Sequence, residues 1–187
     1  MLKLFFSITS DFLFLALLQK EKVLVSIQKE NFRQHSESFF PYLRQVLEKA
    51  GFSLSDIQEV YYTSSFGSQT GLRISLSFVL TLQFLNSFVR FYHLDNLLFQ
   101  VGQKKAISLI GIDLKKTKYY CAVYQNVKCL LEPQIITKNQ LPQLKDKFPR
   151  FPIYKDFQGV DFLTNFQQLL SFFQLFKQIS DAHFKTL

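Results

Sequence analysis

The sequence predicts an α/β fold of two lobes, in which mixed sheets are flanked by helices and the second lobe is the smaller. Two observations lead to this fold class: strands and helices alternate along the chain, and their order in the first half partly recurs in the second. A third is composition, because 48% of the 187 residues are hydrophobic and 19% are charged, which is typical of a folded chain. We expect a first lobe over residues 1–103 and an abbreviated second lobe over 104–187.

Three strands open the first lobe and form a meander, because short polar clusters separate runs rich in apolar residues. They are expected at Leu4–Thr9, Phe12–Gln19 and Lys22–Gln28. A helix over Ser38–Ala50 follows, where apolar residues recur at helical spacing and Gly51 ends the pattern. Ser36 or Ser38 can cap its start.

A strand at Ile57–Ser64, a helix at Leu72–Val89 and a short strand at Leu97–Val101 complete the first lobe. This order of three strands, helix, strand, helix and strand is that of a ribonuclease-H-like lobe.

The second lobe begins in the same way. Three strands are expected at Ala106–Asp113, Lys118–Tyr124 and Lys128–Ile136. A polar helix near Asn139–Lys147, a short strand near Ile153 and a final helix from Asp161 to Ile179 follow. The repeated order of elements predicts a structural duplication.

The loop Ser65–Arg73 joins a strand to a helix and is rich in Gly, Ser and Thr. Such a loop offers backbone N–H groups and a helix N-terminus to an anion. It lacks a Lys after its second Gly, so it is not a Walker loop. An ordinary turn that needs Gly for its backbone angles explains the same residues.

Positive charge is concentrated in the second half of the chain. Residues 1–95 hold 9 Lys/Arg against 8 Asp/Glu, whereas residues 96–187 hold 13 against 6. The basic residues form three groups: Lys104 with Lys105; Lys115, Lys116 and Lys118; and Lys145, Lys147 and Arg150. They could attract an anionic partner such as RNA. The absence of an aromatic and basic RNA motif favours a plain solvated face instead.

Several classes of function find no support in the sequence. Cys121 and Cys129 lack the second pair that a zinc site or disulfide framework needs, and the three histidines lack metal-binding spacing. We therefore expect no metal, no cofactor and no catalytic residues. The N-terminus lacks a signal-peptide cleavage site, and polar residues interrupt Leu72–Val89, so we expect a cytoplasmic protein without a membrane span.

Two helices are apolar around most of their circumference, Leu72–Val89 and Phe162–Phe176. A helix that is apolar all round requires burial on all sides. Either a sheet and a neighbouring helix cover these faces within the chain, or a second protein covers them.

Four segments together resemble the TsaB (YeaZ) family over roughly residues 1–115. They are Arg33-Gln34-His35-Ser36-Glu37, Lys49-Ala50-Gly51, Ser53-Leu54-Ser55-Asp56-Ile57 and Ser68-Gln69-Thr70-Gly71-Leu72-Arg73. The resemblance implies an actin-like, sugar-kinase-like fold and a non-catalytic role. In that family the protein is the dimerisation partner of TsaD, with which it serves threonylcarbamoylation of N6 of adenosine 37 in tRNAs that read ANN codons.

The sequence departs from the family at two places that bear on nucleotide chemistry. Ile8-Thr9-Ser10 stands where the family has Asp-Thr-Ser, so the acid used near a metal-bound phosphate is missing. The glycine-rich loop has lost one Gly and its Pro. Ile112-Asp113-Leu114-Lys115 is similar to the family's Asp-Ala-Arg strand end.

The resemblance implies a contact with a TsaD-type subunit through the first-lobe helices. We expect it to be formed by Phe39, Leu43, Leu72, Leu76, Val79, Leu80 and Gln83. Motif residues expected to support it are Arg33, His35, Glu37, Ser68, Thr70, Gly71 and Arg73. A TsaE-type ATPase would complete a larger complex that meets tRNA indirectly, and the chain alone would pair with itself. A basic tRNA-binding subunit and a degenerate ATPase are the alternatives.

Overall fold

The computed structural model describes residues 1–8, 11–30, 35–64, 69–113 and 115–176. Contacts divide the chain into two compact units, one formed by Met1–Leu94 with the segment from Phe173, the other by Asp95–Phe172. The first unit therefore ends nine residues before the boundary expected from the sequence, and the chain returns to it near its C-terminus.

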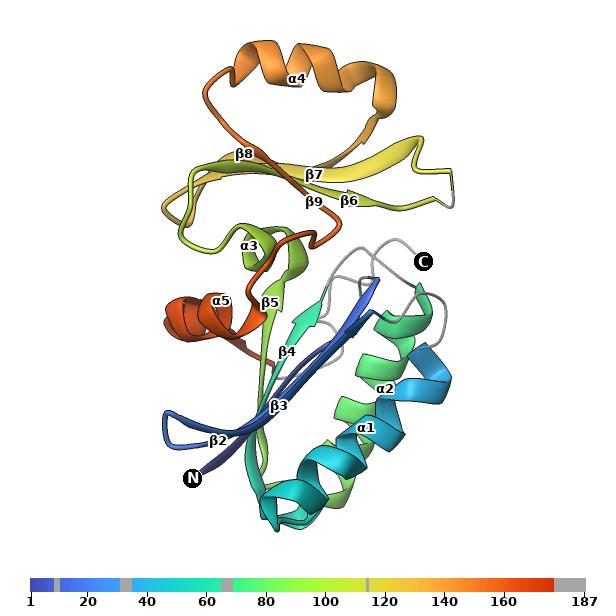
Figure 1. Cartoon of the computed structure of the whole chain (residues 1–187), viewed down its shortest axis with the longest axis vertical. Coiled ribbons are helices and arrows are strands. Elements are labelled where there is room, and N and C mark those ends of the chain that lie inside the picture. Colours follow the sequence, from blue (N-terminus) through green and yellow to red (C-terminus); the bar gives the residue numbers. More distant parts are fainter. Residues whose placement is uncertain (9–10, 31–34, 65–68, 114, 177–187) are drawn as a thin grey trace. The chain divides into compact units, whose positions relative to one another are not determined.

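A six-stranded mixed sheet forms the centre of the first unit, with the order β10-β5-β4-β1-β2-β3 (Figure 1). Its strands are β1 (Leu2–Ser7), β2 (Phe12–Gln19), β3 (Lys22–Glu30), β4 (Ile57–Ser64), β5 (Arg90–Asp95) and β10 (Gln174–Leu175). The first three form the expected antiparallel meander. β4 pairs with β1 in parallel, and β10 pairs with β5 antiparallel.

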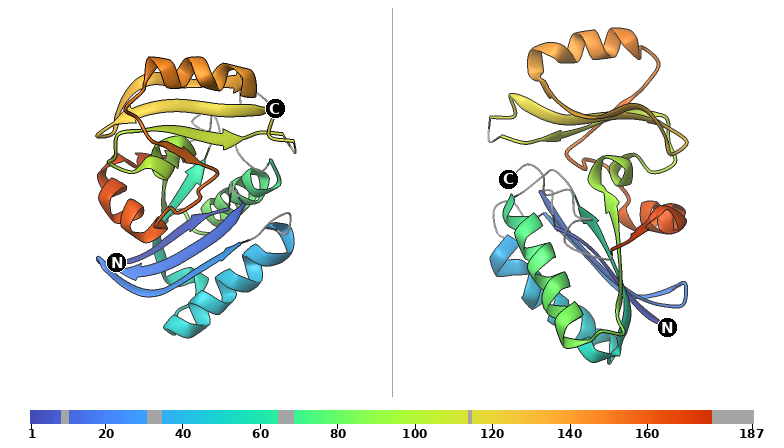
Figure 2. Two further views of the ribbon diagram at one scale, coloured as in Figure 1. Left: turned by 45° about the horizontal axis from the view of Figure 1, so that its top comes forward. Right: turned by 180° about the vertical axis from the view of Figure 1, so that it is seen from behind.

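Two helices cover one face of this sheet, α1 (His35–Ala50) and α2 (Gln69–Leu85), as both views of Figure 2 show. Side chains alternate across β1, so Leu4 and Phe6 point toward the helices. The Phe6 ring lies 5.2 Å from the ring of Phe39 and 5.6 Å from that of Phe78, measured between centroids. The core of the first unit therefore sits between sheet and helix pair. A 3-10 turn, η1 (Leu54–Asp56), links α1 to β4.

The second unit is built on a four-stranded sheet with the order β8-β7-β6-β9. Its strands are β6 (Ala106–Gly111), β7 (Lys118–Gln125), β8 (Lys128–Thr137) and β9 (Ile153–Lys155). Its helical segments are α3 (Asn96–Val101), η2 (Lys138–Gln140), α4 (Leu141–Lys147), α5 (Phe162–Leu169) and η3 (Leu170–Phe172). The first three strands are antiparallel neighbours, and β9 pairs with β6 in parallel. The side chains of α4 pack on one face of this sheet.

The strand expected at Leu97–Val101 is wrong, because these residues form α3. The Asp95 side chain accepts a hydrogen bond from Leu97 N at 2.6 Å and caps the helix, which Gly102 ends at a φ of 67°. The strand lies earlier, at Arg90–Asp95. Helix α2 is also shorter than expected, because it ends at Leu85 and does not reach Val89.

The final helix is shorter than the expected Asp161–Ile179. It ends at Leu169, and Gln174–Leu175 is the edge strand β10 of the first unit. Tertiary contacts cause the change, since Phe176 N donates to Phe91 O at 2.8 Å and the Phe173 ring packs against Phe5. Residues 177–179 lie outside the described part of the chain.

Candidate functional site

The helix pair of the first unit is held together by aromatic rings. The ring of Phe78 on α2 lies 5.3 Å from that of Phe39 and 6.2 Å from that of Phe40 on α1. Phe39, Leu43 and Val79 are only 0%, 4% and 0% exposed, respectively. These three residues, which we expected at a partner contact, are therefore core residues, and a partner cannot reach them while the first unit is folded.

Four of the expected contact residues form a ridge along α2: Leu72, Leu76, Leu80 and Gln83. All four are half-buried. At 100° per residue they lie roughly 120–160° around the helix from Phe78. The buried parts of Leu76 and Leu80 pack against the core of the first unit. The ridge, unlike the core residues, is partly open to a partner.

Among the described residues of the first unit, the most exposed large apolar side chains lie at the C-terminal end of α2 and in the turn that follows it. Phe84, Leu85 and Phe88 are 88%, 69% and 91% exposed. Asn86 fixes the turn that follows the helix, because its Oδ1 accepts from Phe88 N at 3.1 Å. We call Phe84, Leu85 and Phe88 the apolar end of α2. The sequence showed that this helix is apolar all round, but it did not show which residues stay exposed.

The motif residues contribute little that can bind a ligand. Arg33 and Ser68 lie outside the described residues, and His35 begins α1. Glu37 is exposed in the first turn of α1, where its carboxylate interacts favourably with the helix dipole. Thr70 and Arg73 are exposed.

Gly71 is buried in the first turn of α2, and its carbonyl accepts from Ser75 Oγ at 2.9 Å. Residues 65–68, which belong to the loop where the sequence allows an anion to bind, lie outside the described part of the chain.

Ile8, which stands where the family resemblance implies an acid, lies in an apolar environment. Ile8 follows β1, is 0% exposed and belongs to the core between sheet and helices. In the second unit, the Asp113 carboxylate accepts from Thr117 Oγ1 at 2.6 Å and from Lys118 N at 2.8 Å. The hydrogen bond from the Thr117 hydroxyl lowers the pKa of Asp113. This carboxylate stabilises its own turn.

A serine and a histidine meet in the first unit, which the sequence did not indicate. Ser64 Oγ and His93 Nδ1 are 3.2 Å apart across 29 residues of sequence. His93 is 7% exposed, and the rings of Tyr62 and Phe176 lie 6.1 and 6.2 Å from it. Because these rings enclose the imidazole, the pair serves to join neighbouring strands β4 and β5.

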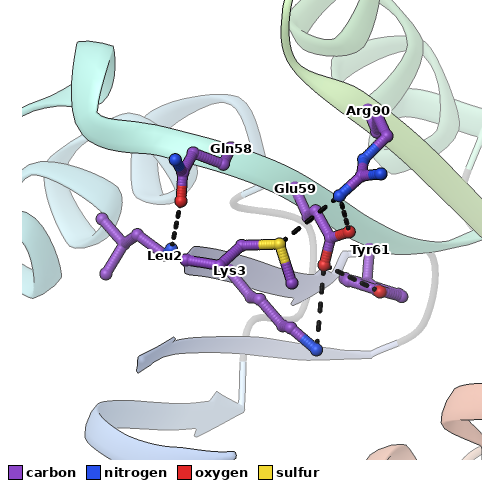
Figure 3. A network of polar contacts seen from close by, with 7 residues as sticks. Leu2, Lys3, Gln58, Glu59, Tyr61 and Arg90 are labelled. Atoms are coloured by element: carbon purple, nitrogen blue, oxygen red, sulfur yellow. Dashed lines mark hydrogen bonds and ion pairs between the residues drawn. The ribbon is translucent and has the colours of Figure 1, made fainter. Parts of the chain in front are cut away.

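Glu59 is the centre of a polar network that joins β1, β4 and β5 (Figure 3). Its Oε1 accepts from Arg90 Nη2 at 2.8 Å, and its Oε2 lies 3.7 Å from Lys3 Nζ. Tyr61 OH donates to Oε2 at 3.1 Å. Burial, with the charge of Glu59 added, raises the pKa of Tyr61. The network is structural, since its carboxylate is engaged by three groups of the chain itself.

No group of three or more His, Cys, Asp or Glu side chains in the described part could hold a metal ion. Cys121 and Cys129 are free thiols, and burial raises the pKa of Cys121 to about 12. None of the helices among the described residues is long and apolar enough to cross a membrane.

Comparisons with known proteins give one family and a set of similar folds. The model of the family described as "TsaD: tRNA N6-adenosine threonylcarbamoyltransferase" matches residues 25–151. A Pseudomonas aeruginosa structure described as an uncharacterized protein with similarity to peptidase YEAZ has a TM-score of 0.70 at 16% identity, covering 94% of each chain. YeaZ from Pseudomonas aeruginosa has a TM-score of 0.62 at 16% identity, covering 91% of each chain. No curated protein matches the sequence.

Proposed function

Since the chain belongs to the family described as "TsaD: tRNA N6-adenosine threonylcarbamoyltransferase", we propose that it is the TsaB-type, non-catalytic subunit that pairs with a TsaD-type catalytic subunit. The resemblance to TsaB (YeaZ) is confirmed by this match and by the YeaZ fold of the chain. The predicted fold class is confirmed as well: actin-like, with two mixed α/β lobes and a reduced second sheet. The pair would act in threonylcarbamoylation of N6 of adenosine 37 in ANN-decoding tRNAs, which implies a cytoplasmic location.

The observation that carries this proposal is the apolar end of α2. Three large side chains stand 69–91% exposed within five residues of sequence, next to the half-buried ridge. Fully burying one such side chain contributes about 1.5–3 kcal/mol. A few well-packed aromatic anchors of this kind supply most of the binding energy of a protein interface. We therefore centre the proposed contact on Phe84, Leu85 and Phe88 and extend it along Leu76 and Leu80.

A non-catalytic role is supported by what the possible reactive groups do within the chain. The acid position is occupied by buried Ile8, Asp113 stabilises a turn, and His93 is enclosed by aromatic rings. These observations disfavour the alternative of a degenerate ATPase. The test is direct: the purified chain should hydrolyse no ATP above a blank, and a turnover that survives further purification would favour the ATPase.

Co-expression with TsaD from the same organism tests the proposed pairing. The tagged chain should retain TsaD, whereas the double variant Phe84→Asp/Phe88→Asp should lose it, because two carboxylates would have to be desolvated in the contact. Leu130→Asp/Ile135→Asp, which changes two residues of β8 that are 41% and 51% exposed, is the matched control and should retain TsaD.

Circular dichroism must show the same folded content for all three proteins. If the double variant binds TsaD as well as the control does, the apolar end of α2 is not the contact. If the unchanged chain retains no TsaD, the pairing itself is refuted.

Two further partners belong to the same proposal. In the absence of TsaD, the apolar end would be covered by a second copy of the chain, so the double variant should shift a homodimer to monomer in size-exclusion chromatography. A TsaE-type ATPase should join only after TsaD has bound, and its retention by the chain alone would contradict that order.

A further inference from the structure

Basic and aromatic side chains lie against one another along one edge of the second unit. Lys105 Nζ lies 4.4 Å from the ring centroid of Phe151, and Lys147 Nζ lies 5.8 Å from that of Phe148. Lys104 Nζ is 5.0 Å from the ring of Tyr154, and Lys155 Nζ is 4.9 Å from that of Tyr119. We call Lys105, Lys147, Phe148, Arg150, Phe151 and Lys155 the basic edge.

The backbone holds the basic edge together. Strand β9 is the outer strand of the four-stranded sheet, and it pairs with β6 so that Ile153 is opposite Ile107. Ile107 N also donates to Pro152 O at 2.9 Å, which fixes the start of β6 beside the segment that leads from α4 into β9. Lys105 immediately precedes β6, so the pairing of β6 with β9 brings it to the aromatic residues that follow α4.

The charges of the basic edge are not neutralised within the described residues. Lys105, Lys147 and Arg150 are exposed, and none of them forms an ion pair there. Residues 141–155 hold four basic side chains and a single acidic one, Asp146. An aromatic ring orients a lysine without cancelling its charge, so the ammonium groups are held in place and stay available to an anion.

Phe148 and Phe151 add a second property to the edge. Their rings meet at 5.3 Å in a T-shaped arrangement, and both side chains are half-exposed. Rings of this kind can stack on unpaired bases, while neighbouring cations follow the phosphate backbone. Both side chains also pack against the core of the second unit, so only part of each ring is accessible. Cations next to half-exposed aromatic rings fit a single-stranded or loop region of RNA better than they fit a uniform anionic surface.

We propose that the basic edge binds RNA directly, through phosphate contacts from Lys105, Lys147, Arg150 and Lys155 and stacking on Phe148 and Phe151. The inference rests on the proposed function and makes it more specific: the tRNA is contacted by this chain as well as by the catalytic subunit. Four phosphate contacts give a slope of about −3 for the logarithm of affinity against that of salt concentration, and roughly a sixtyfold loss between about 50 and 200 mM salt.

The experiment measures binding of the full chain to an unmodified transcript of an ANN-decoding tRNA over this salt range. The double variant Lys105→Gln/Arg150→Gln should reduce the steepness of the salt dependence by about 1.5, since each lost phosphate contact on a single strand removes about 0.7. The control Lys22→Gln/Lys29→Gln changes the net charge equally at exposed positions of β3 and should keep the slope. Replacing Phe151 with Leu should weaken binding at every salt concentration without changing the slope.

Three results would overturn the inference: equal slopes for the two double variants, no binding of the transcript at the lowest salt, or retention by anionic lipid vesicles without retention by RNA. Each variant is also tested for TsaD retention. If the chain retains TsaD but does not bind RNA, only RNA binding by the basic edge is refuted. If it binds RNA but does not retain TsaD, the proposed pairing is refuted.

Discussion

Replacement of Glu59 by Gln tests whether the buried network of the first unit contributes to stability. The side chain of Glu59 is 5% exposed and that of Lys3 is 11% exposed, whereas Arg90 is 56% exposed. Gln has the same shape and can still accept the hydrogen bond from Tyr61. The substitution therefore removes the negative charge and leaves the Lys3 ammonium buried without its counter-ion.

Removal of one partner from a buried ion pair costs about 3–5 kcal/mol. Two features of this site favour the low end of that range. Arg90 is largely in solvent and regains hydration, and Lys3 Nζ keeps its position 5.7 Å from the ring of Tyr61. We therefore expect Glu59→Gln to lower the free energy of unfolding by about 3 kcal/mol, which lowers the urea midpoint by about 1 M.

The assay is urea unfolding followed by circular dichroism, with native β1 and β4 amides followed by hydrogen exchange. The second variant, Lys3→Met/Glu59→Gln, removes both charges and should recover most of the loss, because it leaves no buried charge without a counter-ion. Arg90→Gln should cost less than Glu59→Gln. An unchanged midpoint for Glu59→Gln, or a double variant less stable than the single one, would refute the reasoning.

Three further changes give measurable outcomes. Gly102→Ala should destabilise the protein by about 2 kcal/mol or more, because its φ is +67° and a Cβ would lie 2.8 Å from Asn165 Oδ1. Gly159→Ala is the control, since Gly159 has the same φ with open space around it. Its loss of stability in urea unfolding should be smaller, and the difference between the two variants measures the effect of the contact with Asn165. Asp161→Ala removes the α5 cap and should cost about 1 kcal/mol at pH 7. Hydrogen bonds to the Asp161 carboxylate lower its pKa, so the stabilisation is present above about pH 4 and is lost as pH falls further. Unfolding at pH 3 should therefore show a smaller difference between the two proteins. Cys121 should resist alkylation at pH 8 until the protein unfolds, because burial raises its pKa to about 12, and labelling at the rate of a free thiol would contradict its burial.

The fold could be predicted wherever a local pattern determined it. The meander of β1, β2 and β3 follows from apolar runs separated by polar residues, and β6, β7 and β8 follow in the same way. Leu97–Val101 is a short apolar run that suits a strand or a helix equally, and the cap at Asp95 with Gly102 after the run was the signal for a helix. Strand β10 has two residues and forms only through its pairing with β5, so no local sequence pattern predicts it.

The candidate contact could be predicted only to the level of a helix. Phe39 and Phe40 are neighbours of the same type, yet the first is 0% and the second 52% exposed. Apolarity indicates that α2 lacks cover, but exposure depends on where α1 and the sheet lie. The ion pairs of Glu59 with Lys3 and Arg90, and the Ser64 and His93 pair, join residues 29 or more positions apart. Such contacts follow from sheet order, which one sequence does not reveal.

The two proposed surfaces lie on different units, and their chemistry differs accordingly. The contact on α2 depends on burial of apolar area, which salt weakens little, so TsaD should remain bound at salt concentrations that release RNA from the basic edge. Pull-down of the complex with tRNA across a salt gradient should therefore release RNA first and leave the protein pair intact. Simultaneous loss of both partners would mean that the two surfaces are not independent, and it would contradict the assignment of one role to each unit.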